Sequence, residues 1–161
     1  DEVAVLPSGF TSKIRSINAG EQEVKEAYAP MSISITLEDD IDVSRGDMIV
    51  KKNNQPEQEQ EFDVMLCWLN NDAIKPRAKY TIMHTSNEER AIIKEVVYKM
   101  DINTFERDSE DSNLEMNDIA RVKIRTTRRL MLDSYRDNRN TGSIILIDEN
   151  TNETVAAGMI V

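Results

Sequence analysis

Apolar and polar residues alternate with a period of two in several segments of this 161-residue chain. Successive side chains of a β-strand point to opposite faces, so this period predicts strands with one buried face. The segments that show it are residues 31–37, 62–69, 79–84 and 121–125. Many short strands separated by turn residues are typical of barrels and sandwiches. We therefore predict an all-β fold of one of these two types.

Three further segments add to the expected strands. Residues 143–147 and 155–161 are apolar in almost every position, which suits strands buried on both sides. In residues 89–100, the spacing of Ile92, Ile93 and Val96 also fits a helix face. The β-branched content and Tyr98 favour a strand there.

A polar segment divides the chain. Residues 51–61 have no apolar side chain beyond Pro56, so they bury little and are typical of a linker. We place the linker at residues 53–61, between a first unit of residues 1–52 and a second of residues 62–161. A β unit of about 50 residues is small for independent stability. We therefore expect the first unit to be an incomplete barrel whose unpaired edge favours self-association.

Charge and composition limit the classes of function. Twenty basic and thirty acidic residues give a net charge of −10, which repels polyanions and disfavours nucleic acid as a partner. No apolar run approaches the ~20 residues that span a bilayer, so we expect no membrane insertion. The single cysteine, Cys67, fits a reducing compartment, and we expect the cytoplasm. Because residue 1 is Asp, we also expect a longer parent protein.

The sequence offers little for catalysis. None of its five glycines precedes a lysine, so no phosphate-binding loop can be identified. Residues 38–47 have acidic residues at alternate positions like a calcium loop, but Gly46 comes one residue late and Lys51 stands where glutamate is needed. One histidine and one cysteine do not make a zinc site without several carboxylates. We expect no catalytic, cofactor-binding or metal-binding residue in this chain.

A cluster of basic residues is the one candidate binding site. Seven cations fall within 19 positions: Arg121, Lys123, Arg125, Arg128, Arg129, Arg136 and Arg139. One interpretation is a patch for an anionic ligand or an acidic partner. The alternative is a solvated strand face with acidic neighbours on the adjacent strands, which we favour.

Three other features have both structural and functional interpretations. His84 ends an alternating segment and could change charge near neutral pH, although a hydrogen-bonded structural role is commoner. We expect Trp68 to anchor the core of the second unit. The polar side chains of residues 138–141 either cap a turn or present a binding surface, and the sequence favours neither.

Residues 3–14, Ala29-Pro30, 31–37 and 41–47 resemble strands of the second β-barrel of translation-factor GTPases. The rest of the chain resembles the third domain of the sulfate adenylyltransferase large subunit, a GTPase built like elongation factor Tu. The matching pieces are Trp68-Leu69 and residues 80–85, 98–104, 117–120 and 138–158. The joint occurrence of Asp101-Ile-Asn103-Thr104 with residues 138–142 and 152–158 is the most specific part.

The resemblance implies a function. In that family, the small subunit forms adenosine 5′-phosphosulfate from ATP and sulfate, while the large subunit hydrolyses GTP. It implies a partial second-domain barrel followed by a Greek-key third-domain barrel. These would be an inactive docking and regulatory region that binds the small subunit and its own GTPase domain. GTP and magnesium would belong to that missing domain. The alternative is a region of a translation-type GTPase that contacts RNA through the seven cations.

Overall fold

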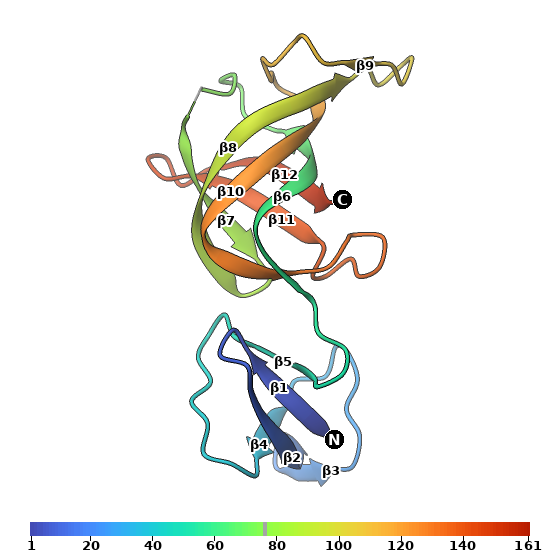
Figure 1. Ribbon diagram of the computed structural model, residues 1–161, viewed down its shortest axis with the longest axis vertical. Helices are drawn as coiled ribbons and strands as arrows, with labels where there is room; N and C mark the ends of the chain where they lie inside the picture. The colour runs from blue at the N-terminus through green and yellow to red at the C-terminus, as the bar shows by residue number, and fades with distance from the viewer. Residues whose placement is uncertain (76) are drawn as a thin grey trace. The chain divides into compact units, whose positions relative to one another are not determined.

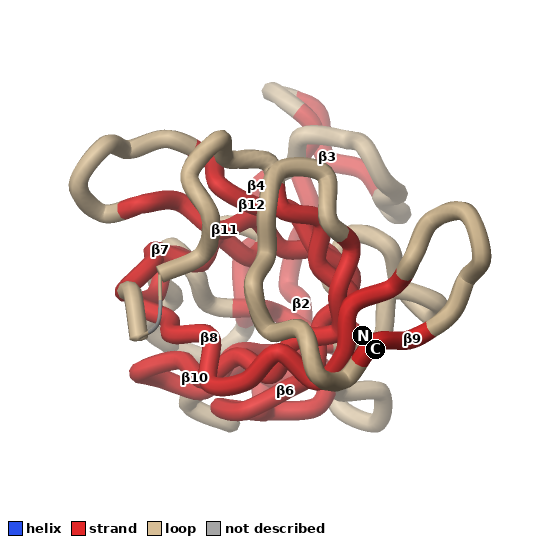
Figure 2. The backbone as a smooth tube through the Cα atoms, turned by 90° about the horizontal axis from the view of Figure 1, so that it is seen from above, coloured by secondary structure: helices blue, strands red, loops and turns tan. Residues whose placement is uncertain are grey.

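The computed structural model describes residues 1–75 and 77–161. All regular structure in these residues is β, as the strand segments in Figure 2 show, and none of them forms a helix that could cross a membrane. The chain divides into two compact units, Asp1–Gln55 and Pro56–Val161 (Figure 1). The prediction of an all-β fold is confirmed.

The first unit is one curled, half-barrel sheet of five antiparallel strands. These are β1 (Glu2–Leu6), β2 (Phe10–Ala19), β3 (Gln22–Val24), β4 (Ser34–Leu37) and β5 (Met48–Lys51). They follow the order β3-β2-β1-β5, and β4 pairs with β2. Gly9, with a φ of 77°, lies in the tight β1–β2 turn, where a side chain would be strained. The apolar core of the sheet is small, because its fully buried apolar residues are those of β1.

The second unit is a closed barrel of six long strands with one short addition. The strands are β6 (Glu57–Trp68), β7 (Lys79–His84), β8 (Asn87–Met100), β9 (Arg107–Asp108), β10 (Ile119–Leu132), β11 (Ser143–Asp148) and β12 (Thr154–Ile160). The order β10-β6-β12-β11-β7-β8 closes because β10 also pairs with β8, while β9 lengthens the end of β8.

Connectivity makes this barrel a Greek key. β7, β8 and β10 are successive neighbours, and β11 returns to lie on the other side of β7. Inward-facing residues of all six strands fill the interior, including Leu66, Ile82 and Leu146. Trp68 anchors this core, as predicted: it is 2% exposed and packs edge to face on Tyr80, with ring centroids 6.0 Å apart.

The expected linker is partly wrong, because residues 57–61 belong to β6. Except at Gln60, their backbone pairs with β10, so these polar residues satisfy their main chain without contributing apolar side chains to the core. Gln60 also bonds through its side chain, whose amide donates to the carbonyls of Thr126 and Thr127, both at 3.0 Å. The polar side chains therefore indicated a linker, although most of the backbone is paired in a strand.

Two other expectations need correction. Burial on both sides was expected for residues 143–147 and 155–161, but Ile144 and Leu146 are buried while Ile145 is partly exposed and Met159 is 44% exposed. Burial in β11 alternates because a barrel wall has one inner face, whereas the neighbours Val155 and Ala156 of β12 are both buried. In the first unit, the strand expected at residues 31–37 begins only at Ser34. Residues 89–100, the segment with two interpretations, form part of β8.

Candidate functional site

Three of the seven cations of the candidate basic cluster lie on the outer face of β10. Arg121, Lys123 and Arg125 alternate with the buried Ala120, Val122 and Ile124 of the barrel core. Carboxylates stand opposite them on both neighbouring strands. Lys123 is in register with Asp63 and Glu95, and Arg125 is in register with Glu61.

Ion pairs connect this strand face. Arg121 Nη2 lies 2.7 Å from Asp63 Oδ2, and Lys94 Nζ lies 2.8 Å from Glu61 Oε2. The hydrogen bond from Lys94, together with the charges of Lys94, Lys123 and Arg125, lowers the pKa of Glu61. Cations and carboxylates are thus interleaved across β6, β8 and β10, which is the arrangement expected of a solvated strand face.

The next two cations lie in a bulge of β10, where its pairing with β6 shifts between Arg125 and Leu130. Arg128 pairs with Glu89, a carboxylate that is only 7% exposed and also accepts a 2.7 Å hydrogen bond from Thr127. The guanidinium of Arg128 therefore balances a buried charge. Arg129 is exposed.

The last two, Arg136 and Arg139, lie apart from the strand face, in the loop of residues 133–142 that joins β10 to β11. This loop is fixed by its own polar groups: Asn138 Oδ1 accepts from the Asn140 amide, and Thr141 Oγ1 donates to Asp133. A side chain at Gly142 would collide with the backbone of Tyr135, so the loop closes tightly there. The polar side chains of this loop therefore cap the turn, and Arg136 and Arg139 are exposed.

His84 supports the same loop from beneath. Its ring is 2% exposed, and Nε2 donates to the Thr141 carbonyl at 2.6 Å. Burial lowers the pKa of His84, and the Thr141 carbonyl and the charge of Asp133 oppose that shift. His84 therefore has the hydrogen-bonded structural role that is the commoner one for a lone histidine.

A second surface lies at the β8–β9–β10 end of the barrel. Residues 99–119, named here the β8–β10 lobe, surround a cavity of about 800 Å³. Asp101, Ile102 and Asn103 line it from one side, and Asn117, Asp118 and Ile119 line it from the other. Two segments that carried the sequence resemblance therefore meet around one hollow.

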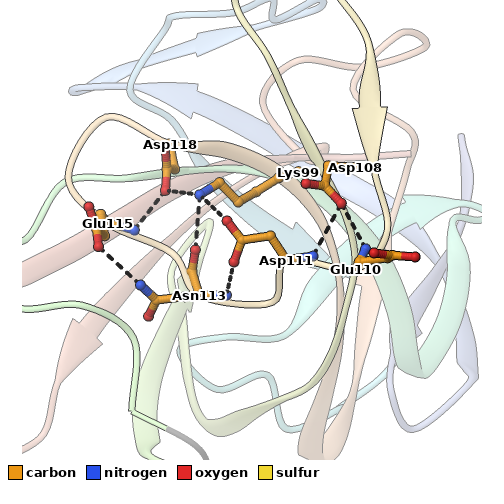
Figure 3. Close-up of polar contacts among 7 residues, drawn as sticks. All are labelled: Lys99, Asp108, Glu110, Asp111, Asn113, Glu115 and Asp118. Carbon is orange, nitrogen blue, oxygen red and sulfur yellow. Dashed lines mark hydrogen bonds and ion pairs between the residues drawn. The ribbon is translucent and has the colours of Figure 1, made fainter.

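Lys99 organises the base of this lobe (Figure 3). Its Nζ contacts Asp111 Oδ2 at 2.8 Å, Asp118 Oδ2 at 2.9 Å and the Asn113 carbonyl at 3.1 Å. Hydrogen bonds to the two carboxylates raise the pKa of Lys99, and the same lysine lowers the pKa of Asp111. All three ammonium donors of Lys99 have acceptors in this network, so the loop is held to β8.

Asp101 shapes the rim. Its carboxylate accepts the amides of Asn103 and Thr104 at 2.7 and 3.0 Å, and its carbonyl accepts the amide of Phe105 at 2.8 Å. These bonds hold Phe105 at a φ of 60°, with its ring 72% exposed. Arg107 lies 4.8 Å from the centroid of the Tyr98 ring, a cation–π contact.

Sequence reasoning missed this surface because residues 106–113 are polar and have the composition of an ordinary loop between strands. A signal was present: residues 99–119 hold seven carboxylates and two cations, a net charge of −5, which is half of the −10 of the whole chain. Within residues 1–75 and 77–161, no group of three or more His, Cys, Asp or Glu side chains is arranged to hold a metal ion.

Solved structures define the class of this fold. A crystal structure of Sup35 complexed with GDP superposes with a TM-score of 0.87 at 18% identity, covering 100% of this chain and 40% of that one. The Sup35 complex with GMPPNP gives a TM-score of 0.88 at 17% identity. A curled β sheet followed by a closed Greek-key barrel is thus a fold that this chain shares with part of Sup35.

The chain belongs to the GTP-eEF1A C-terminal domain-like family, whose model matches residues 61–161. Over its whole length it is homologous to sulfate adenylyltransferase subunit 1 and CysN. It is 47% identical to the bifunctional enzyme CysN/CysC of Mycobacterium tuberculosis, covering 99% of this chain and 26% of that protein. It is 43% identical to sulfate adenylyltransferase subunit 1 of Sulfurovum, covering 100% and 35%. The chain spans about a quarter to a third of these relatives.

Proposed function

We propose that this chain is the β-barrel docking and regulatory region of the GTP-hydrolysing large subunit of a sulfate adenylyltransferase. The observation that carries the proposal is homology over the whole chain to subunit 1 and CysN/CysC at 43–47% identity. In this role the chain has no active site of its own. The parent enzyme would make adenosine 5′-phosphosulfate from ATP and sulfate, and GTP and magnesium would bind in its GTPase domain.

Two partners follow from this role: the small subunit of the enzyme and the GTPase domain of the same parent. The regulatory part of the proposal is that a change at one of these two contacts alters the other through the barrel. The proposal further includes self-association through the open sheet of the first unit, with a cytoplasmic site of action and no membrane contact.

RNA binding through the basic cluster has weaker support. Arg121 and Arg128 are in ion pairs, and Lys123 and Arg125 lie opposite carboxylates. Arg136 and Arg139 are on a separate loop, so the seven cations do not form one continuous positive surface. Phosphate neutralisation requires such a surface.

The test is the mass of the complex. The chain is mixed with the purified small subunit of sulfate adenylyltransferase and measured by light scattering on a sizing column. We expect one peak with the summed mass, because the docking groups are within this chain. Two separate peaks would overturn the proposal. Retention on immobilised RNA that falls steeply with salt would instead favour the translation-type alternative.

A further inference from the structure

We infer that the β8–β10 lobe is the docking surface for a protein segment that presents an apolar side chain flanked by lysine or arginine. This inference rests on the proposed function and places that segment on the small subunit. The lobe combines exposed apolar side chains, a cavity and a strong negative charge, and each of these features has a separate origin in the structure.

The apolar part consists of Ile102, Phe105 and Met116, which are 59%, 72% and 49% exposed. These three large apolar side chains lie within 15 residues of one another, and their exposure to water is unfavourable. Ile102 and Met116 line the cavity of about 800 Å³. Exposed apolar patches rimmed by polar residues mark interaction sites in soluble proteins.

The backbone at Phe105 is strained, because its φ is 60°. A positive φ is rare for a bulky residue and costs of order 1 kcal/mol or more. The Asp101 carboxylate and carbonyl hold the turn through three backbone amides, which keeps the ring outside the core. Hydrogen bonds to the Asn103 and Thr104 amides lower the pKa of Asp101, so the turn is secure at neutral pH. An exposed aromatic ring on a backbone that is held in place suits the centre of an interface.

Charge identifies the occupant. Lys99 is paired with two carboxylates and is therefore not free for an anionic ligand, which leaves the exposed Arg107, lying over Tyr98, as the other cation of the lobe. Among the described residues, the carboxylates of Glu106 and Glu110 accept no hydrogen bond and form no ion pair, and both side chains are exposed. With a net charge of −5, the lobe repels RNA and other polyanions and attracts a basic protein surface.

Two variants of the 161-residue chain test the inference by titration calorimetry against the small subunit. Phe105→Ala removes the ring, and Glu106→Lys/Glu110→Lys reverses two charges that the lobe does not use internally. We expect Phe105→Ala to weaken binding by about thirtyfold, as for a hot spot. We expect the double variant to weaken it by at least about tenfold at ~0.1 M salt, with a smaller dependence on salt.

Matched controls use equivalent changes elsewhere. Phe10→Ala removes a ring that is 64% exposed in the first unit, and Glu88→Lys/Glu153→Lys makes the same change of charge on exposed positions outside the lobe. Unchanged Trp68 fluorescence and unfolding midpoint show that each variant is folded. Wild-type binding that the lobe variants leave intact overturns this inference alone. Absence of any wild-type binding overturns both the inference and the proposed function.

Discussion

At the scale of single residues, the surroundings of a side chain decide its role. His84 is the only histidine of the chain, and a histidine on a strand end can serve as a pH switch or a hydrogen-bond donor. The barrel buries the ring against the Thr141 carbonyl, so the neutral form is favoured. Its role is to hold the loop of residues 133–142 in place.

The lowered pKa of His84 predicts a pH dependence of stability. Above the unfolded-state pKa of about 6.5, histidine is neutral in both states and the folded state keeps its full stability. As pH falls below that value, the unfolded chain takes up the proton first. The free energy of unfolding therefore decreases, by at most about 1.4 kcal/mol per pH unit.

His84→Gln removes the titrating group and keeps an amide that can donate to Thr141. We expect the variant to lose the decrease in stability between about pH 6.5 and 5 that the wild type shows. Urea unfolding followed by Trp68, the single tryptophan, measures this at each pH. Parallel curves for the two proteins would show that His84 does not cause the effect.

At the scale of elements, β10 shows how a strand tolerates three extra residues, since residues 126–129 lie opposite Gln60 alone. Its pairing with β6 stops after Arg125 and resumes at Leu130. Thr126 turns inward and donates from Oγ1 to the Arg128 carbonyl at 2.6 Å, while Gln60 on β6 donates to the Thr126 and Thr127 carbonyls. Side chains thus replace the missing ladder hydrogen bonds at the bulge.

Gln60→Ala should destabilise the barrel because it leaves two backbone carbonyls without their donor. We expect a loss of about 1–2 kcal/mol in the free energy of unfolding. Gln58→Ala is the control, since Gln58 lies on the same strand and is half-buried but makes no side-chain hydrogen bond among the described residues. Equal effects of the two substitutions in urea unfolding would contradict a stabilising role for the hydrogen bonds of Gln60.

At the scale of the whole molecule, the two units differ in how they treat sheet edges. The barrel of Pro56–Val161 closes on itself, and closure removes every edge of its wall. The sheet of Asp1–Gln55 stays open: β3, β4 and β5 each have one partner strand. Ile33, Val43 and Ile49 are 37–44% exposed around a cavity of about 700 Å³ in that unit.

Open edges and exposed apolar residues predict self-association of the chain. We expect the mass from light scattering to rise with protein concentration. Ile49→Lys places a charge on the β5 edge and should return the mass to that of a monomer. Met159→Lys, at an exposed position of the barrel, should leave association unchanged. A monomer at all concentrations would contradict the prediction.

The sequence alone determined the fold class and most strands, because a period of two is a local property of each strand. The alternation of Val122 and Ile124 with Arg121, Lys123 and Arg125 placed one face of β10 correctly. The same reasoning failed at residues 57–61, which belong to a paired strand but show no alternation of apolar and polar residues. Local polarity reports on side chains, whereas strand pairing satisfies the backbone.

Only the tertiary structure decided which charges meet. Asp63 and Arg121 are 58 positions apart, and Glu89 and Arg128 are 39 apart, so no local pattern predicts either pair. The β8–β10 lobe has the same origin, because residues 99–103 and 116–119 meet only when β8 pairs with β10. Hydrophobic periodicity is set by neighbours along the chain, while electrostatic surroundings are set by long-range strand register.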